Sequence, residues 1–463
     1  MFWILLLAFL IFILWFYFFF TKKPLTVTPR VPVVSGRLPF IGCGIDFIKN
    51  PKQFLLACIK QHGETFQLHL FGFDLIFTFS REGLAALYQI RENEASFTEA
   101  TRTLLQLKLP PEATTGSMTM FHRGFRKRLF DGYLFHINNA IANKLSELDS
   151  TKGTFEIFSF MKELVHRIGF LCWVGQEAAR VDYLRRFVAD FEELDPEKGF
   201  QNLASLSWTL LSRKRNEYRA LKDMEDVLKE IWLEREKRGE HVDDNLTSLH
   251  EMYADLSEAE RYRKVALNVF QFHLASQANT YAALSWTFIN ILQHRRLCDE
   301  GLMRDVTRAD GRTLDVDVLD EMNFVDDVVD ESLRLAQQSI TLRKVVRECQ
   351  FEKYRVPKGI YLATLLSITN SAVAETEKSA NEFWPFRQRR DPSDTRVSTF
   401  GHGFHACPGR RFALAIVKVF LVRALTRFDF TPQFREVCIP PGSVGAVARA
   451  SHPCVVQYRV KEQ

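Results

Sequence analysis

The chain opens with an uninterrupted apolar run, Phe2 to Phe20, that is rich in phenylalanine, leucine and isoleucine. At about 1.5 Å per residue, a helix of this length reaches roughly 29 Å, close to the hydrocarbon thickness of a bilayer. No basic residue precedes the run and no small-x-small site follows it, which favours a membrane anchor over a cleavable signal peptide. Lys22 and Lys23 come next, so the positive-inside rule predicts a cytosolic position for the rest of the chain.

The pattern then changes to a proline-spaced segment, 21–42, in which prolines stand at positions 24, 29, 32 and 39 among short polar or β-branched residues. Proline fixes φ and interrupts helices, so this segment is expected to be a stiff, extended hinge. We therefore divide the chain into an anchor (2–20), a hinge (21–42) and a main domain (43–463).

Within the main domain, strand-like and helix-like patterns are segregated. Apolar residues alternate or cluster on both sides of Gly72, in Thr65–Gly72 and Leu75–Phe79, which predicts a β-hairpin. Between Pro111 and Pro357 there is a single proline, and apolar residues recur at i, i+3 and i+4, which is typical of helices. The predicted fold class is mainly α with a small β-rich part.

The longest predicted helix covers Val265 to Leu292 and carries the string Ala-Ser-Gln-Ala-Asn-Thr, residues 275–280, near its middle. Strand patterns return after residue 340. Tyr354–Gly359, which contains Pro-Lys-Gly, is predicted to be a turn between strands. The last part of the chain, 440–460, is predicted to form a final hairpin.

Composition adds few constraints. The 463 residues allow one large domain or two ordinary ones, and 46% hydrophobic with 25% charged residues is typical of globular proteins. The net charge of 61 − 56 = +5 is too small to favour nucleic acid, and it suits a membrane surface or an acidic partner better. None of the eight cysteines forms a Cys-x-x-Cys pair, so neither a zinc site nor a disulfide framework is expected. Scattered cysteines fit a reducing compartment.

The strongest chemical signal is the sequence Phe-Gly-His-Gly-Phe-His-Ala-Cys-Pro-Gly, residues 400–409. Gly403 and Gly409 suit a backbone that turns tightly and passes close to a flat ligand. A strongly apolar helix is predicted from Arg411, so Cys407 stands just before a helix N-terminus, where amides and the helix dipole favour a thiolate. Such a thiolate is a metal ligand or a nucleophile; the alternative is a buried structural cysteine.

This loop resembles the cysteine loop of the cytochrome P450 family, Phe-x-x-Gly-x-Arg-x-Cys-x-Gly. Four fixed positions match, including Phe400, Gly403 and Cys407, and His405 replaces the arginine. The resemblance implies the cytochrome P450 fold, preceded here by one transmembrane helix. It also implies haem b (iron protoporphyrin) as the cofactor, with Cys407 as the axial thiolate and metal ligand.

In that family, a long helix crosses the haem and carries an acid–threonine pair that supplies protons during oxygen activation. Thr280 matches the threonine, while Asn279 replaces the acid and Gln277 stands where glycine is common. Asparagine can hold a water but cannot ionise. The alternative for Thr280 is a hydroxyl bonded to the preceding helical turn. The same string resembles the cholesterol and oxysterol 7α-hydroxylase branch, and the tail resembles the sterol and prostacyclin synthase branches, where it borders the substrate.

Further family positions are matched by charged residues. Glu331 and Arg334 form Glu-x-x-Arg, and Arg387 lies in an element resembling Phe-x-Pro-x-Arg, so these three are expected to form a structural lock. Arg343 is expected to bind a haem propionate, and His405 to bind one more weakly because it is mostly neutral at pH 7. Arg126, or its neighbour Lys127, is a further propionate candidate, with a solvated basic face as the alternative.

The resemblance implies a monooxygenase that hydroxylates a sterol, an oxysterol or a similar lipid with O₂. Electrons would come from an NADPH-dependent flavoprotein reductase. The protein would be a single-pass protein of the endoplasmic reticulum membrane, with its catalytic domain in the cytosol. Two alternatives remain: a haem-thiolate isomerase or dehydratase that rearranges a lipid peroxide, and a non-catalytic haem or lipid binder. Sequence alone does not choose the substrate or the carbon attacked.

Overall fold

The computed structural model describes residues 27–36, 41–114, 121–122, 124–125, 127–148, 151–195, 209, 211–372, 378–387, 397–440 and 443–462. The predicted anchor, 2–20, lies outside these ranges. Every helix within them is either too short or too polar to cross a bilayer.

Helices make up most of the described chain. They are α2 (Gly44–Lys49), α3 (Pro51–His62), α4 (Arg81–Gln89), α5 (Phe97–Leu105), α7 (Lys127–Ser146), α8 (Ile157–Val174), α9 (Val181–Leu194), α12 (Arg215–Arg238), α13 (Asn245–Met252), α14 (Glu258–Gln293), α15 (Arg295–Ala309), α16 (Val316–Asp320), α17 (Asn323–Ala336), α18 (Leu366–Ala372) and α19 (Arg410–Arg427). Single 3₁₀ turns lie at Pro111–Thr114, Gln176–Ala179 and Gly403–His405.

The strands form three small sheets in the described part of the chain. They are β1 (Thr65–Leu70), β2 (Phe73–Thr78), β3 (Ala95–Ser96), β4 (Lys152–Glu156), β5 (Ile340–Val345), β6 (Cys349–Phe351), β7 (Tyr354–Val356), β8 (Tyr361–Leu365), β9 (Phe428–Pro432) and β10 (Val455–Val460). The sheet orders are β1-β2-β8-β5-β3, β4-β10-β9 and β6-β7. The predicted class, mainly α with a small β part, is confirmed.

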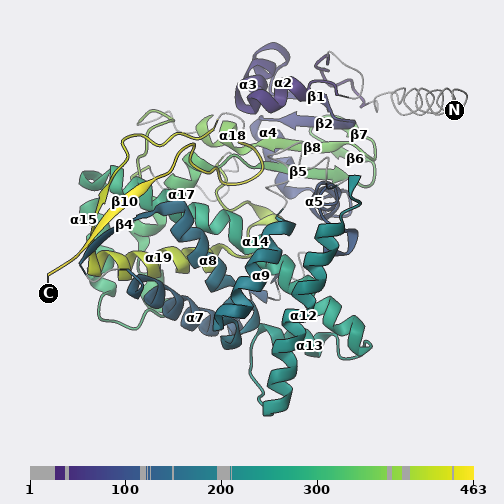
Figure 1. Cartoon of the computed structure of the whole chain (residues 1–463). Helices are drawn as coiled ribbons and strands as arrows, with labels where there is room; N and C mark the ends of the chain where they lie inside the picture. Colours follow the sequence, from purple (N-terminus) through teal and green to yellow (C-terminus); the bar gives the residue numbers. More distant parts are fainter. Residues whose placement is uncertain are drawn as a thin grey trace, which may run out of the picture.

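The β1–β2 hairpin forms as predicted, with Thr65 opposite Thr78 and Leu70 opposite Phe73. Its two-residue turn places Phe71 and Gly72 at positive φ, which is typical of the tight turns that match strand twist. The five-stranded sheet lies at one end of the molecule, with α2 and α3 beside it and the helical body on its other side (Figure 1). It combines strands from both halves of the chain.

The described part of the proline-spaced segment pairs with β7 of the two-stranded sheet and with β1 of the five-stranded sheet. Thr28 forms an antiparallel bridge with Arg355, and Val33 forms a parallel bridge with Gln67. Val27 and Val31 are buried. Residues 27–36 are therefore extended, and they pack against the main domain.

Two predictions for the β part need correction. No strand was expected in the helical span, yet β4 forms there because β10 pairs with it, placing Val455 opposite Glu156. The tail is not a hairpin of its own, because β10 pairs with β4 and β9 while the described residues 443–454 run as a loop. Both differences arise from pairing between distant segments, which local patterns do not specify. Of the predicted turn Tyr354–Gly359, the first three residues form β7, and the turn itself, Pro357–Gly359, lies between β7 and β8 with Gly359 at φ of 104°.

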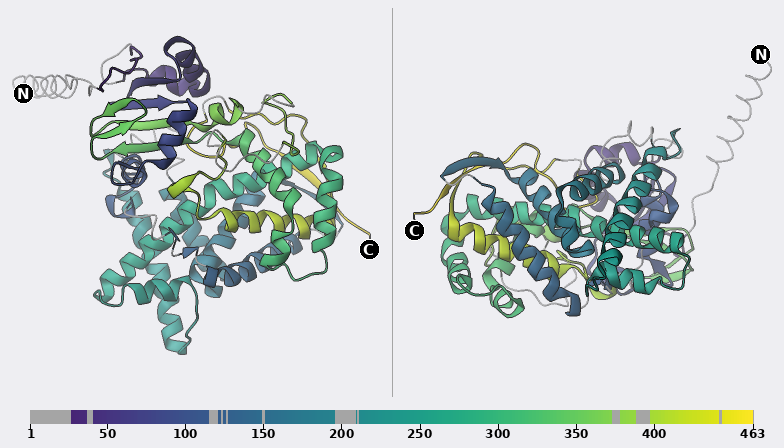
Figure 2. Two further views of the ribbon diagram at one scale, coloured as in Figure 1. Left: turned by 180° about the vertical axis from the view of Figure 1, so that it is seen from behind. Right: turned by 60° about the horizontal axis from the view of Figure 1, so that its bottom comes forward.

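The long helix α14 crosses the helical body, with α8 beside it and α12 and α13 far from the sheet (Figures 1 and 2). It begins at Glu258, about two turns before the predicted start, because Ser257 and Glu260 form a capping box. Phe288 of α14 packs edge-on against Phe420 of α19, with ring centroids 5.5 Å apart. The main apolar core thus surrounds the helix that carries the residue 275–280 string.

A buried ion pair joins the segment after α5 to α12. Lys108 Nζ lies 2.6 Å from Glu217 Oε1, and both side chains are almost fully buried. Lys214, at the start of α12, donates to the carbonyls of Gln106 and Leu109 in return. Each segment thus holds the other through a lysine.

Candidate active site

The cysteine loop, residues 400–409, is held by its own backbone. The Cys407 amide donates to the Phe400 carbonyl over 2.6 Å, and the turn Gly403–His405 precedes it. Gly403 has φ of 60°, and a Cβ at that position would lie 2.8 Å from the Tyr88 carbonyl oxygen. Both the conformation and the close approach require glycine. The loop ends where α19 begins at Arg410, three residues after the cysteine.

The electrostatics around Cys407 are mixed. Its side chain is exposed, whereas six of the eight cysteines are buried. Protein atoms around the sulfur desolvate a thiolate and raise the pKa of the Cys407 thiol above its ordinary value. Hydrogen bonds from the Gly409 and Arg410 amides act in the opposite direction, as does the Arg410 guanidinium. An accessible sulfur faced by amide donors suits a metal ligand, because a bound cation removes the thiol proton.

Arg343 is a buried cation that forms few hydrogen bonds with the described part of the protein. It is 1% exposed, its Nη1 donates to the Leu342 carbonyl over 3.1 Å, and its Nε has no hydrogen-bond partner among the described residues. Burial lowers the pKa of Arg343 to about 10, with the charge of Glu92 acting in the opposite direction. The guanidinium lies 5.2 Å from the centroid of the Phe97 ring. A buried guanidinium without a carboxylate bonded to it fits an anionic group of a ligand.

His405 lies in the same cluster. Its ring centroid is 5.7 Å from that of Phe97, and its Nε2 lies 3.4 Å from a Glu92 carboxylate oxygen. Within the part of the chain that the structure describes, neither ring nitrogen has a partner in hydrogen-bond geometry. Burial and the charge of Arg343 lower the pKa of His405, so the imidazole is neutral at pH 7. Arg343 and His405 therefore offer one cation and one neutral donor, a set that fits the two propionates of haem.

The middle of α14 exposes one stripe, although residues 265–273 and 282–292 on either side of it are buried. Ala275 and Asn279 are exposed, Leu274 and Ala278 are half-buried, and Thr280 is 6% exposed. Residues three and four apart share a helix face, so these four positions form a continuous accessible stripe beside Thr280. Three of the four are apolar, and Asn279 is the only polar group among them.

Asn279 has a protein partner that the sequence did not reveal. Its Oδ1 accepts a hydrogen bond from the Val447 amide over 3.0 Å. Nearby, Trp286 Nε1 donates to the Ala448 carbonyl over 2.7 Å, and Arg449 Nε donates to the Tyr281 hydroxyl over 2.7 Å. The loop 443–449, here called the tail loop, is therefore attached to α14 beside the accessible stripe. No local signal marks this contact, because the partners come from distant parts of the chain.

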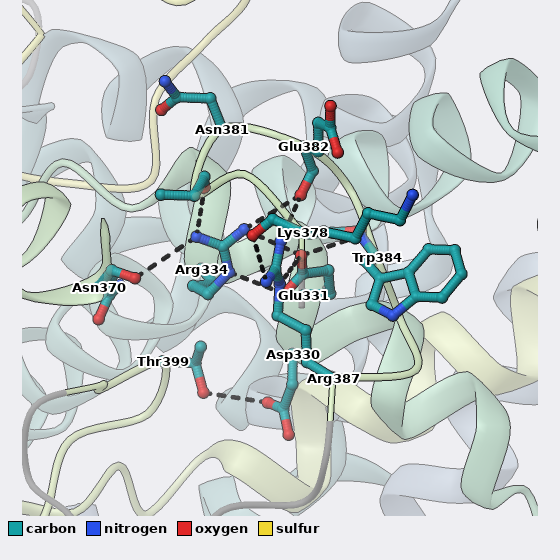
Figure 3. A network of polar contacts seen from close by, with 12 residues as sticks. Asp330, Glu331, Arg334, Asn370, Lys378, Asn381, Glu382, Trp384, Arg387 and Thr399 are labelled. Carbon is teal, nitrogen blue, oxygen red and sulfur yellow. Dashed lines mark hydrogen bonds and ion pairs between the residues drawn. The ribbon is translucent and has the colours of Figure 1, made fainter. Parts of the chain in front are cut away.

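Glu331, Arg334 and Arg387 lie together, as the sequence predicts (Figure 3). Glu331 Oε2 accepts from Arg334 Nε over 2.7 Å, while Oε1 accepts from Arg387 Nε over 2.9 Å and from the Trp384 amide over 3.0 Å. All three charged side chains are at most 9% exposed. The remaining guanidinium nitrogens donate to backbone carbonyls, including that of Glu382. The network thereby fixes the segment 378–387 against α17.

Aromatic rings connect the cysteine loop to α14. The Phe125 ring lies 5.8 Å from Phe412, near the start of α19, and 6.5 Å from Phe272 of α14. A Cβ at Gly409 would lie 3.3 Å from the Phe125 ring. Arg126 lies outside the described residues, as does the side chain of Lys127.

Comparisons with known proteins cover nearly the whole chain. A family model described as Cytochrome P450 matches residues 32–456. The 5-beta-cholestane-3-alpha,7-alpha-diol 12-alpha-hydroxylase of Sus scrofa is 23% identical over 455 residues, which cover 89% of this chain and 88% of the relative. Abscisic acid 8'-hydroxylase 1 of Arabidopsis thaliana is 21% identical over 422 residues, which cover 87% and 86%. A solved structure titled "Retinoic acid bound cyanobacterial CYP120A1" has a TM-score of 0.72 at 19% identity, covering 95% of this chain and 100% of that one, so it has the same fold.

Proposed function

Since the chain belongs to the cytochrome P450 family and is a haem-dependent monooxygenase, we propose that its substrate is a sterol, an oxysterol or a similar lipid. The observation that carries this proposal is the combination of an apolar accessible stripe on α14 with a relative named for the hydroxylation of a cholestane diol. A rigid, mostly apolar substrate suits a surface with one polar group, because apolar contacts supply affinity and a few polar groups fix orientation.

Haem b, once bound, supplies the oxygen activation and the oxidising power. We assign Cys407 as the axial thiolate, with the loop around Phe400 and Gly403 shaping the approach of the macrocycle. Arg343 and His405 would hold the propionates, in keeping with the unpartnered nitrogens of both side chains. Arg126 is proposed as a further propionate ligand.

Thr280 and Asn279 are proposed to manage protons and water at the accessible stripe. The Thr280 hydroxyl can both donate and accept a hydrogen bond, so it can pass a proton without ionising. Asn279 Oδ1 is taken by Val447, which leaves the Nδ2 hydrogens to hold a water. Glu331, Arg334 and Arg387 would contribute by holding the segment before the cysteine loop in place.

We also propose that residues 2–20 anchor the protein in the endoplasmic reticulum membrane, that 21–42 form the hinge, and that 43–463 form a cytosolic catalytic domain. A lipid substrate would then enter from the bilayer. Electrons would come from an NADPH-dependent flavoprotein reductase, since the family depends on redox partners. The exposed arginines Arg410 and Arg411 at the start of α19 would favour an acidic docking surface.

The experiment has two stages. The purified enzyme should give the red-shifted carbon monoxide difference band of thiolate-ligated haem, and Cys407→Ala should abolish it. Sterols, oxysterols and fatty acid peroxides are then screened for substrate-induced spectral shifts. Hits are incubated with reductase, with and without NADPH. NADPH-dependent hydroxylation of a sterol supports the proposal. Product without NADPH would indicate the isomerase alternative instead, which Asn279 at the acid position would permit.

A further inference from the structure

A buried polar network lies on the α8 side of α14. His166 Nδ1 of α8 lies 2.9 Å from His273 Nε2, and Gln277 Nε2 lies 3.4 Å from His273 Nδ1 and 3.3 Å from Ser276 Oγ. Trp173 Nε1 donates to Ser276 Oγ over 3.3 Å. All five side chains are at most 5% exposed. Neither the proposed haem contacts nor the structural lock accounts for them.

With the Gln277 amide nitrogen facing His273, the network has one direction. Burial and the neighbouring His166 lower the pKa of His273, so the ring is neutral. Its Nδ1 accepts from the Gln277 amide nitrogen, and its Nε2 therefore donates to His166 Nδ1. Ser276 Oγ accepts from both the Trp173 indole and Gln277, and it donates to the His273 carbonyl over 3.2 Å. Reversing any one of these bonds would place two donors or two acceptors together.

A glycine on α8 leaves room for the Gln277 side chain in its present position. A Cβ at Gly169 would lie 2.1 Å from Gln277 Nε2 and 3.1 Å from His273 Nδ1. The family commonly has glycine at the position of Gln277. In this chain, Gly169 on the neighbouring helix provides the space for the larger side chain. The two positions form a matched pair.

Trp173 connects this network to the helix that follows Cys407. Its ring is 5.3 Å from Phe412, five residues beyond the cysteine, and it stacks on Phe272 of α14 at 5.3 Å. One rigid side chain therefore contacts the start of α19 through its ring and the 275–280 segment through its N–H.

From these contacts we infer that Trp173 and the Gly169–Gln277 pair are positioning residues, which set the placement of the 275–280 segment of α14 relative to the helix bearing the Cys407 loop. The inference rests on the proposed haem site. A buried polar network holds a helix in one register better than apolar packing does, since a shift would break several hydrogen bonds and leave further polar groups without a partner, as Gln277 Oε1 already is among the described residues. The α14 position over the reacting centre would thus depend on residues on the far side of that helix.

The test uses the haem-loaded full chain and carbon monoxide as the probe. The stretching frequency of bound carbon monoxide depends on the groups near it, and it is measured by infrared spectroscopy without any substrate. Trp173→Phe keeps an aromatic ring in the cluster but removes the donor to Ser276 together with part of the ring packing. Gly169→Ala places a methyl against Gln277. Gly132→Ala on α7, where a Cβ would meet nothing within 4 Å, is the matched control.

We expect Trp173→Phe and Gly169→Ala to shift or broaden the band, and Gly132→Ala to leave it unchanged. In a Gln277→Ala background, Gly169→Ala should cause a smaller further shift and a smaller further loss in Tm than in the unmutated protein, because the methyl then meets only the His273 ring. A lower Tm with an unchanged band in both variants would overturn the inference, as would additive effects at positions 169 and 277. If Gly169→Ala fails to fold, the carbon monoxide band of Trp173→Phe still tests the inference. Absence of the thiolate-type band in the unmutated protein would instead refute the proposed function.

Discussion

Replacing Arg343 with methionine should stabilise the haem-free protein and weaken the hold on haem. The guanidinium is almost fully buried, and the structure gives it no carboxylate in hydrogen-bond contact. Burial lowers the pKa of Arg343 to about 10, below its ordinary value in an unfolded chain. The cost of burying the charge is therefore present in full at every pH below about 10, and it is relieved only as the pH rises above that. The full cost of burying the Arg343 charge can therefore be measured in a buffer at neutral pH.

The expected change in unfolding free energy follows from the same lowering of the Arg343 pKa. At about 1.4 kcal/mol for each pKa unit, the charged side chain costs the folded state about 3 kcal/mol. Methionine removes that cost but also loses the contact with the Phe97 ring and one hydrogen bond, about 1 kcal/mol each. The haem-free variant should gain roughly 1 kcal/mol of unfolding free energy. The haem-bound form should lose a charge-assisted bond worth about 1.5–3 kcal/mol, so haem should dissociate about ten to a hundred times faster.

Urea unfolding of the haem-free chain gives the first quantity, and haem transfer to an excess of apomyoglobin gives the second. Arg312→Met is the control, because Arg312 pairs with Glu321 at an exposed site. It should alter stability by less than about 1 kcal/mol and leave haem release unchanged. If Arg343→Met destabilises the haem-free protein and leaves haem release at the original rate, the assignment of Arg343 to a propionate is wrong.

Three further predictions concern other contacts. Glu331→Gln leaves two buried guanidinium groups without a counter-charge and should lower the unfolding free energy by about 3–5 kcal/mol in urea titrations, against less than about 1 kcal/mol for exposed Glu321→Gln. Equal losses would contradict a buried lock. Asn279→Ala leaves the tail-loop amide without its acceptor and should weaken binding of a sterol ligand about tenfold in spectral titrations, whereas Asn279→Asp keeps the acceptor and should bind normally. Similar weakening in both variants would exclude this role. Lys108→Met and Glu217→Leu should each cost about 3–5 kcal/mol in urea, and the double variant should recover most of that loss; additive losses would refute coupling across the buried pair.

Local patterns were sufficient for much of the fold. The β1–β2 hairpin and the long helix α14 follow from apolar spacing and from Gly72, features that operate within a few residues. The contacts of Glu331, Arg334 and Arg387 were expected because family motifs order those residues along the chain, and the structure brings the three side chains together. The residues that allowed each of these predictions are either close together in sequence or part of a motif of the family.

What the sequence did not reveal depends on contacts between distant segments. Nothing near Asn279 indicates that Val447 would bond to it, and nothing near Gln277 points to Gly169 on another helix. The strand β4 looks like part of a helical span until β10 pairs with it. A single sequence shows which residues are able to form such contacts, but it does not show which distant residues lie next to each other in the fold.

The strand order of the five-stranded sheet has a consequence for biosynthesis. Leu75 of β2 pairs with Tyr361 of β8, and most of the chain lies between them. At about 5–20 residues per second, a ribosome takes roughly 15–60 s to make that intervening stretch. During this interval one edge of β2 has no partner, and its apolar residues Ile76 and Phe77, fully buried in the finished protein, lack the cover that residues after 340 later provide. Production of this enzyme in a foreign host should therefore respond strongly to chaperone supply and to slower translation at low temperature.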